Sequence, residues 1–104
     1  MHLTDSTDSL SLASWVVATK DQIAAQFGDE VVVLGFQTGS YYGLGGVGVT
    51  IWNLLQEPRT VAEIRDRLCA EYDVAPEQCE QDLLSFLRQL AQKDLIQVLA
   101  QPPL

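Results

Sequence analysis

Hydrophobic residues repeat with two different periods along this chain, and the change falls near residue 46. Before it the residues favour extended segments, and Val31–Leu34 is the strongest strand signal because β-branched side chains pack well on a pleated surface. Turn-forming residues at 28–29 and 37–40 separate neighbouring segments. We therefore predict one extended segment followed by an antiparallel meander of three strands, at 15–18 and then at 22–27, 30–36 and 41–44.

Beyond residue 46 the hydrophobic positions recur about every 3.6 residues, which predicts three helices. The first runs from Val47 to a stop at Pro58. The second starts at a capping box formed by Thr60 and Glu63. The third starts at Pro76, since proline is tolerated in a first helical turn. It carries one apolar arc, made of Cys79, Leu83, Phe86, Leu87 and Leu90.

The order of these elements predicts an α+β fold. We expect a winged helix-turn-helix-like arrangement, with a three-stranded antiparallel sheet followed by a three-helix bundle. A short apolar piece at 95–99 either adds a final strand or packs on the sheet. A chain of 104 residues suits one domain, which we place at 15–101. Residues 1–14, rich in Ser and Thr and without sustained periodicity, are expected to form a flexible N-terminal segment.

The charge balance is strongly acidic, with 14 acidic against 6 basic residues and a formal net charge of -8. Such a chain repels phosphate backbones. A DNA-reading helix would gather Lys and Arg, whereas the region 77–93 holds more acidic than basic residues. We therefore expect a basic or neutral partner and no nucleic acid.

The distribution of apolar residues also bears on the compartment. No uninterrupted apolar run exceeds four residues, far short of a membrane-spanning helix. Asp5 and Asp8 lie where a secretory signal would carry basic residues. We expect a cytoplasmic protein with no membrane partner.

Residue sets that support catalysis or metal binding are missing from the sequence. Cys69 and Cys79 are ten positions apart, and the single histidine is His2 in the N-terminal segment. Both cysteines are therefore interpreted as small buried hydrophobes and not as a zinc or redox pair. No Lys-Ser or Lys-Thr pair follows the glycines at the strand-to-helix corner, Gly43, Gly45, Gly46 and Gly48. We expect no metal, no cofactor and no enzymatic activity.

The short strand at 41–44 is the feature most suited to binding. If it forms a sheet edge, its free N–H and C=O groups are a template for another extended chain, next to the apolar arc of the third helix. Simple core or sheet packing is the alternative for Tyr41, Tyr42 and Phe86.

Five segments in a fixed order decide between these interpretations. They are SYYGL (40–44), VGVTIWNLL (47–55), TVAEI (60–64), YDV (72–74) and DLLSFLRQL (82–90). In this order and spacing they resemble the PqqD-like family, also called RiPP recognition elements, over residues 22–99. The resemblance implies that the leader of a ribosomally made precursor peptide binds as a fourth strand, in the cleft between the third strand and the third helix.

Carried onto this chain, the resemblance implies a set of leader-binding residues. The strand edge would be Ser40, Tyr41, Tyr42, Gly43 and Leu44, and the facing helix residues would be Asp82, Leu83, Phe86 and Leu90. Asp82 would meet a Lys or Arg of the leader, or else be an ordinary exposed helix charge. Two positions depart from the family pattern: Gly45 stands where Asn commonly caps the first helix, and Asp94 where Gly commonly ends the third.

Within the family, Ile51-Trp52 before Leu54-Leu55 in a free-standing domain is most similar to the split recognition protein of lasso-peptide biosynthesis. That resemblance implies presentation of the leader to a separate leader peptidase or other modifying enzyme. A peptide chaperone that serves a radical enzyme in the PQQ pathway and a winged-helix nucleic-acid-binding protein remain the alternatives. The protein is expected to be a monomer or a dimer paired through the open strand edge.

Overall fold

The structure is a computed structural model that describes residues 10–36 and 38–102. The strands of this part are β1 (Trp15–Ala18), β2 (Gln22–Phe27), β3 (Glu30–Gly35), β4 (Tyr41–Leu44), β5 (Arg59–Thr60) and β6 (Ile96–Leu99). The helices are α1 (Val47–Leu54), α2 (Val61–Glu71) and α3 (Pro76–Gln92). The α+β class, with three-stranded antiparallel sheets and three helices, is confirmed.

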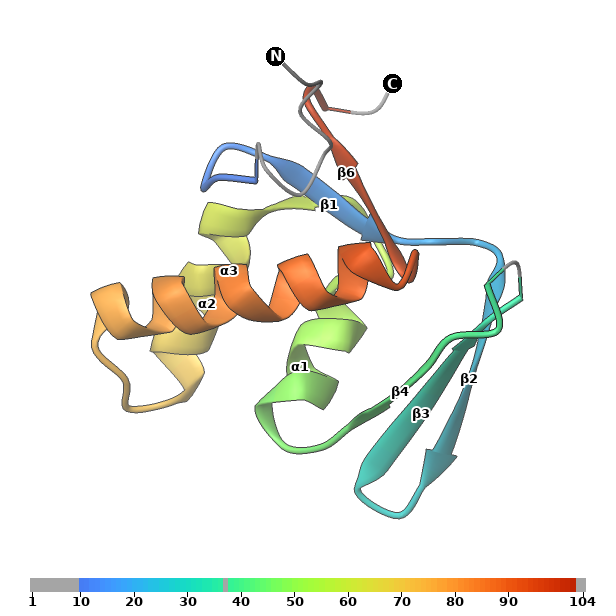
Figure 1. Cartoon of the computed structure of the whole chain (residues 1–104). Helices are drawn as coiled ribbons and strands as arrows, with labels where there is room; N and C mark the ends of the chain where they lie inside the picture. The colour runs from blue at the N-terminus through green and yellow to red at the C-terminus, as the bar shows by residue number, and fades with distance from the viewer. Residues whose placement is uncertain (1–9, 37, 103–104) are drawn as a thin grey trace.

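The predicted meander is present as an antiparallel sheet in the order β2-β3-β4. β2 pairs with β3 from Gln22↔Gly35 to Phe27↔Glu30, and β3 pairs with β4 from Val31↔Leu44 to Leu34↔Tyr41. Gln37, in the predicted turn between β3 and β4, lies outside the described residues. In Figure 1 this sheet stands to one side of the helices, and the chain passes from β4 directly into α1.

A second sheet, in the order β5-β1-β6, was not predicted. The apolar piece near the C-terminus does form a strand, and β6 pairs antiparallel with β1 from Trp15↔Leu99 to Ala18↔Ile96. The two-residue β5 joins the other edge of β1. Such pairing between opposite ends of a chain leaves no local sequence signal, which is why the sequence placed only one sheet.

The core lies between the two sheets and the three helices. Residues of α3 enter it along one stripe, since Cys79, Leu83, Leu87 and Leu90 are buried and Phe86 is only half-buried at the margin. Facing residues from the other elements include Val33, Leu44, Ile51, Leu55 and Ile64. None of the helices in the described ranges is long and apolar enough to cross a membrane.

Both departures from the family pattern fall at helix ends. Asp94 follows α3 with a left-handed backbone, φ 58, a conformation that Asp tolerates better than most residues. The residue that caps α1 is Gly46, with φ 54, and not Gly45. A glycine at position 46 is favoured because a side chain with that φ would be strained.

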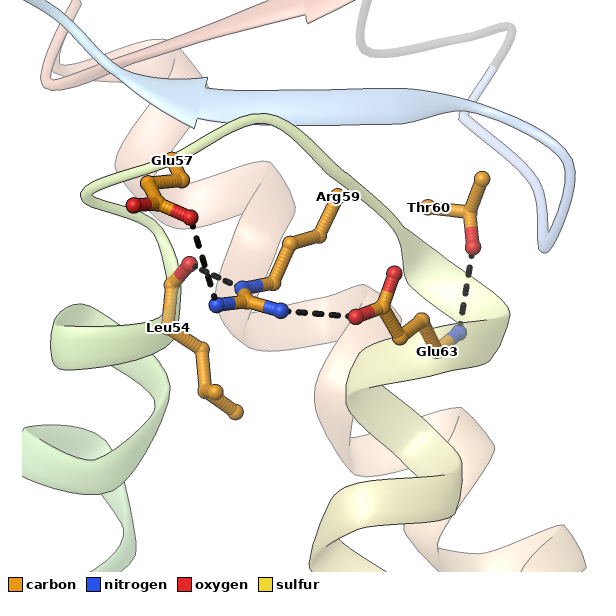
Figure 2. Close-up of polar contacts among 5 residues, drawn as sticks. All are labelled: Leu54, Glu57, Arg59, Thr60 and Glu63. Carbon is orange, nitrogen blue, oxygen red and sulfur yellow. Dashed lines mark hydrogen bonds and ion pairs between the residues drawn. The ribbon is translucent and has the colours of Figure 1, made fainter.

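Arg59 joins the end of α1 to the start of α2, as Figure 2 shows. Its Nε donates to the carbonyl oxygen of Leu54 at 2.7 Å, and its Nη1 donates to a carboxylate oxygen of Glu63 at 2.6 Å. Glu57 is a longer ion-pair partner, at 3.8 Å from Nη2. The predicted cap is present, since the Thr60 hydroxyl accepts from the Glu63 N–H at 3.2 Å, but the Glu63 carboxylate pairs with Arg59.

Part of the expected N-terminal segment packs on the domain. Leu10 is buried, and the carbonyl oxygens of Leu12 and Ser14 accept from the first N–H groups of α2 at 3.0 Å. Residues 1–9, which include His2, lie outside the described residues. The division at 14/15 stays a prediction.

We expect the Thr60→Ala variant to lose about 1 kcal/mol of unfolding free energy, because an N–H of the first turn of α2 loses its acceptor. Thr60→Ser keeps a hydroxyl at the same place and should lose much less. Urea unfolding followed by tryptophan fluorescence measures both values. Equal losses in the two variants would show that the Thr60 methyl group, and not the cap, carries the effect.

Candidate peptide-binding cleft

β4 forms one edge of the meander, so one of its two sides is unpaired among the described strands. The N–H of Gly35 donates to the carbonyl oxygen of Ser40 at 2.8 Å, so the Ser40 carbonyl points toward β3. Backbone groups alternate in direction along an antiparallel strand. It follows that Tyr42 also points its N–H and C=O toward β3, whereas Tyr41 and Gly43 point theirs toward the open edge.

A cleft of about 410 Å³ lies beside this edge, at the corner where β4 turns into α1 and faces α3. Six of the nine sequence-predicted residues line it: Tyr42, Gly43, Leu44, Asp82, Leu83 and Phe86. Most of these side chains are apolar or aromatic, so the cleft suits an apolar side chain of a ligand more than a charged one.

The other three predicted residues lie elsewhere. Leu90 is completely buried in the core, because the apolar arc of α3 is wider than the cleft and its C-terminal part packs inside the protein. Tyr41 is exposed and points to the opposite face of the sheet from its neighbour Tyr42. Ser40 precedes β4 and directs its carbonyl to β3.

Sequence reasoning missed the part of the cleft formed by the helix ends. Gly45 and three residues of α1 line this part, namely Val47, Gly48 and Ile51. The others come from α2, the α2–α3 connection and the start of α3, and they are Leu68, Tyr72, Val74 and Cys79. Gly48 lies against the ring of Phe86, since an added Cβ would stand in ordinary van der Waals contact, 3.7 Å from the tip of that ring. The segments 47–55 and 72–74 already belonged to the family resemblance, which was the available signal.

Tyr42 holds the strand edge against α3. Its ring meets the Phe86 ring edge-on, with centroids 6.0 Å apart, and its hydroxyl donates to the side-chain oxygen of Gln89. The Lys93 ammonium lies 5.9 Å from the centre of the same ring. This set of contacts fixes the distance between β4 and α3, and therefore the width of the cleft at that end.

Two charged residues of opposite sign lie along α3, near its start and just after its end. Asp82 is exposed, and its carboxylate accepts from the Gln78 amide at 2.9 Å. Lys93, beside Tyr42, follows the last residue of α3. The cleft thus combines an apolar floor with an acidic residue, Asp82, at its rim, whereas Lys93 lies beside Tyr42 and outside the cleft lining.

The two cysteines have different environments. Cys79 is buried and lines the cleft, whereas Cys69 is half-buried. Burial raises the pKa of the Cys79 thiol, and a hydrogen bond with Cys69 raises it further. Cys79 therefore stays protonated near neutral pH, as expected for a small buried hydrophobe. In the described residues no three His, Cys, Asp or Glu side chains are grouped to hold a metal ion.

The family model for Coenzyme PQQ synthesis protein D (PqqD) matches residues 30–96. The chain belongs to the PqqD family. The match includes β3, β4, all three helices and the start of β6, so every element that borders the cleft is a PqqD-family element. The resemblance inferred from the five sequence segments is confirmed.

Two solved structures resemble this PqqD-family chain. One, described as "TbiB1 in Complex with the TbiA(beta) Leader Peptide", is 46% identical, covers 78% of this chain and 94% of its own, and has a TM-score of 0.72. The other, described as "Lasso peptide synthetase B1 complexed with the leader peptide", is 21% identical, covers 79% and 96%, and has a TM-score of 0.69, a likeness that shows the fold alone. No curated protein matches the chain.

We expect Cys69 to react with iodoacetamide at least about ten times faster than Cys79, because the thiolate is the nucleophile and burial with a raised pKa suppresses it at Cys79. Single-cysteine variants, Cys79→Ser and Cys69→Ser, followed by mass spectrometry give the two rates. In denaturing urea the rates should become equal. Faster reaction at Cys79 in the folded protein would contradict the environment described for it.

Proposed function

We propose that this protein binds the leader of a ribosomally made precursor peptide as an added strand on β4 and presents it to a separate processing enzyme, the leader peptidase of lasso-peptide biosynthesis. The observation that carries the proposal is a strand edge that no other described strand pairs with, beside an apolar cleft. It occurs in a PqqD-family chain that is 46% identical to a protein solved with a leader peptide. An added strand uses groups that the edge already exposes.

The edge supports a specific register of main-chain hydrogen bonds. Tyr41 and Gly43 direct their N–H and C=O groups outward, so an extended leader would pair with these two residues. Alternate leader side chains would then point to opposite faces of the extended sheet, one set into the cleft and the other to the far side. Ser40 and Leu44 flank this pair and mark the ends of the edge.

The positions of the remaining predicted residues in and around the cleft suit them to different roles. Leu83 and Phe86 would contact an apolar anchor of the leader, since both line the cleft and Leu83 is buried at its base. Asp82, exposed at the rim, would attract a Lys or Arg of the leader, in agreement with the net charge of -8. Leu90 would act from the core by supporting α3.

Two other functions fit less well. The family model carries the name of a PQQ synthesis protein, which keeps a chaperone of a radical enzyme as the second candidate. The resemblance of Ile51-Trp52 before Leu54-Leu55 to the split recognition protein of lasso-peptide biosynthesis favours the lasso pathway over it. The winged helix-turn-helix-like arrangement is kept as part of the proposal, but the acidic charge opposes nucleic-acid binding.

In this function the protein is a binding partner without catalytic activity, metal or cofactor, and it acts in the cytoplasm through a domain at 15–101. Its partners would be the precursor leader and the separate leader peptidase. The open edge also permits a dimer.

Titration with synthetic leaders of the precursor peptides encoded beside the protein tests the function. We expect saturable binding of one native leader with a dissociation constant of about micromolar or tighter, after the cost of ordering a flexible peptide. A scrambled leader should not bind. Tryptophan fluorescence or calorimetry measures the affinity, and failure of every leader to bind would refute the proposal.

A second experiment isolates the main-chain contribution. Gly43→Pro removes one outward N–H and should weaken leader binding about tenfold, as expected when one hydrogen bond is lost. Gly43→Ala is the matched control, because a Cβ at this position meets no atom within 4 Å and the N–H remains. Proline is tolerated on an edge strand whose N–H faces solvent, so both variants should melt like the wild type. Equal affinities of the two variants would contradict strand addition at Gly43.

A further inference from the structure

The two cysteines meet where the end of α2 packs against the start of α3. Cys69 is in the last turn of α2, Cys79 is in the first turn of α3, and residues 72–75 connect the two helices. A hydrogen bond joins the two thiols. Their spacing of ten residues did not predict a redox pair, because the packing of α2 against α3 creates this proximity.

An ion pair between neighbours of the cysteines fastens the same two helices. Arg65, one turn before Cys69 on α2, places its Nη1 3.6 Å from a carboxylate oxygen of Glu80, which follows Cys79 on α3. The Arg65 charge also acts on both thiols. A positive charge beside thiols stabilises a thiolate, the form of cysteine that attacks an oxidant.

The two thiols differ in their access to solvent, which suits them to different roles. Cys79 is buried, and burial raises the pKa of its thiol, with the hydrogen bond to Cys69 as the second cause. Cys69 is half-buried, so a small oxidant reaches it first. Redox-sensing cysteines are accessible and often lie next to a second thiol that resolves the oxidised sulfur. Cys69 suits the first role and Cys79 the second.

Cys79 lines the peptide-binding cleft, so a change at its sulfur acts on that site. Leu68 and Tyr72, on either side of Cys69 in sequence, line the cleft too, whereas Cys69 itself lies outside the lining. A covalent S–S bond is much shorter than a hydrogen bond between thiols, so its formation draws the end of α2 and the start of α3 together. A close-packed interior transmits such a shift, because it has few voids to absorb it.

We propose that Cys69 and Cys79 are a redox-sensitive modification site, at which a peroxide forms a disulfide that displaces the cleft lining at the α2–α3 connection and weakens binding of the leader. The effect on the leader rests on the proposed function, whereas formation of the disulfide does not. The cytoplasm in which we expect the protein is reducing, so such a bond forms transiently there and acts as a sensor of oxidants. A thiol reductant reverses it.

The oxidation proceeds in two balanced steps. The Cys69 thiolate attacks one oxygen of hydrogen peroxide, the O–O bond breaks, and the other oxygen leaves as hydroxide, which takes up the proton that Cys69 released. The Cys79 sulfur then attacks the sulfenic acid of Cys69, the S–O bond breaks, and the leaving hydroxide takes up the Cys79 proton. The two thiols lose two electrons and two protons, and one peroxide becomes two water molecules.

The first part of the test detects the bond. Trypsin cleaves after Arg67 and Arg88 and releases residues 68–88, which contain both cysteines. The folded protein is treated with hydrogen peroxide, and the remaining thiols are blocked with N-ethylmaleimide. We expect mass spectrometry to find this peptide two hydrogen atoms lighter and unblocked, whereas Cys79→Ala gives only oxygen adducts at Cys69.

The second part measures leader affinity by calorimetry in the reduced and oxidised states. The oxidised wild type should bind the leader about tenfold or more weakly, as when an anchor no longer fits its pocket, and dithiothreitol should restore the affinity. Cys69→Ser is the matched control, because it cannot form the bond and its side chain lies outside the cleft lining. Its affinity should change by less than about twofold on oxidation. Thermal melting checks the fold, and Cys69→Ala replaces the serine variant if that melts early.

The outcomes separate the two proposals. Sulfinic acid at Cys69 without a disulfide, a disulfide between two copies of the peptide, or a disulfide that leaves leader affinity unchanged overturns the redox inference and leaves the proposed function standing. Equal weakening in oxidised Cys69→Ser assigns the effect to another oxidised group and also overturns it. Absence of leader binding in the reduced wild type overturns the proposed function and, with it, the redox control of binding.

Discussion

The contact between Tyr42 and α3 controls the geometry of the candidate site. Its ring packs edge-on against Phe86, its hydroxyl bonds to Gln89, and Lys93 lies above the ring. Because these contacts use the inward side chain of β4, they leave the backbone of Tyr41 and Gly43 free to face the open edge. One strand thereby packs on the core and keeps a hydrogen-bonding edge available for a ligand.

The meander has a different role from the second sheet. β1, β5 and β6 join the two ends of the domain and the link between α1 and α2, which Arg59 strengthens through Leu54 and Glu63. The meander instead stands to one side of the helices (Figure 1) and has an open edge beside an apolar cleft, while Ile23, Phe27 and Leu34 of its strands are exposed. Because the β5-β1-β6 sheet joins the ends of the domain, the edge of the β2-β3-β4 sheet can stay accessible without opening the core.

The candidate site shows which of its features a residue pattern can predict and which it cannot. The period of about 3.6 correctly predicted the apolar arc of α3, but it could not tell that Leu83 and Phe86 reach the cleft and Leu90 lies in the core. The sequence named both Tyr41 and Tyr42 as candidates, and only the pairing of β4 with β3 decided that Tyr42 faces α3 while Tyr41 points to the other side of the sheet. The resemblance predicted a cleft between β4 and α3. The packing of the helices decided that residues of α1 and of the α2–α3 connection line it as well.

By itself the sequence determined the α+β class, the meander, the positions of the three helices, the Thr60 cap and the membership of the PqqD family. The elements and the cap depend on propensities, periods and turn residues within a few positions of one another, whereas the family membership depends on the order and spacing of five segments. Only the tertiary structure decided that β6 pairs with β1, that Arg59 bridges two helices and that Ile23, Phe27 and Leu34 of the meander are exposed. Those features depend on contacts between residues far apart in the chain, for which local patterns carry no information.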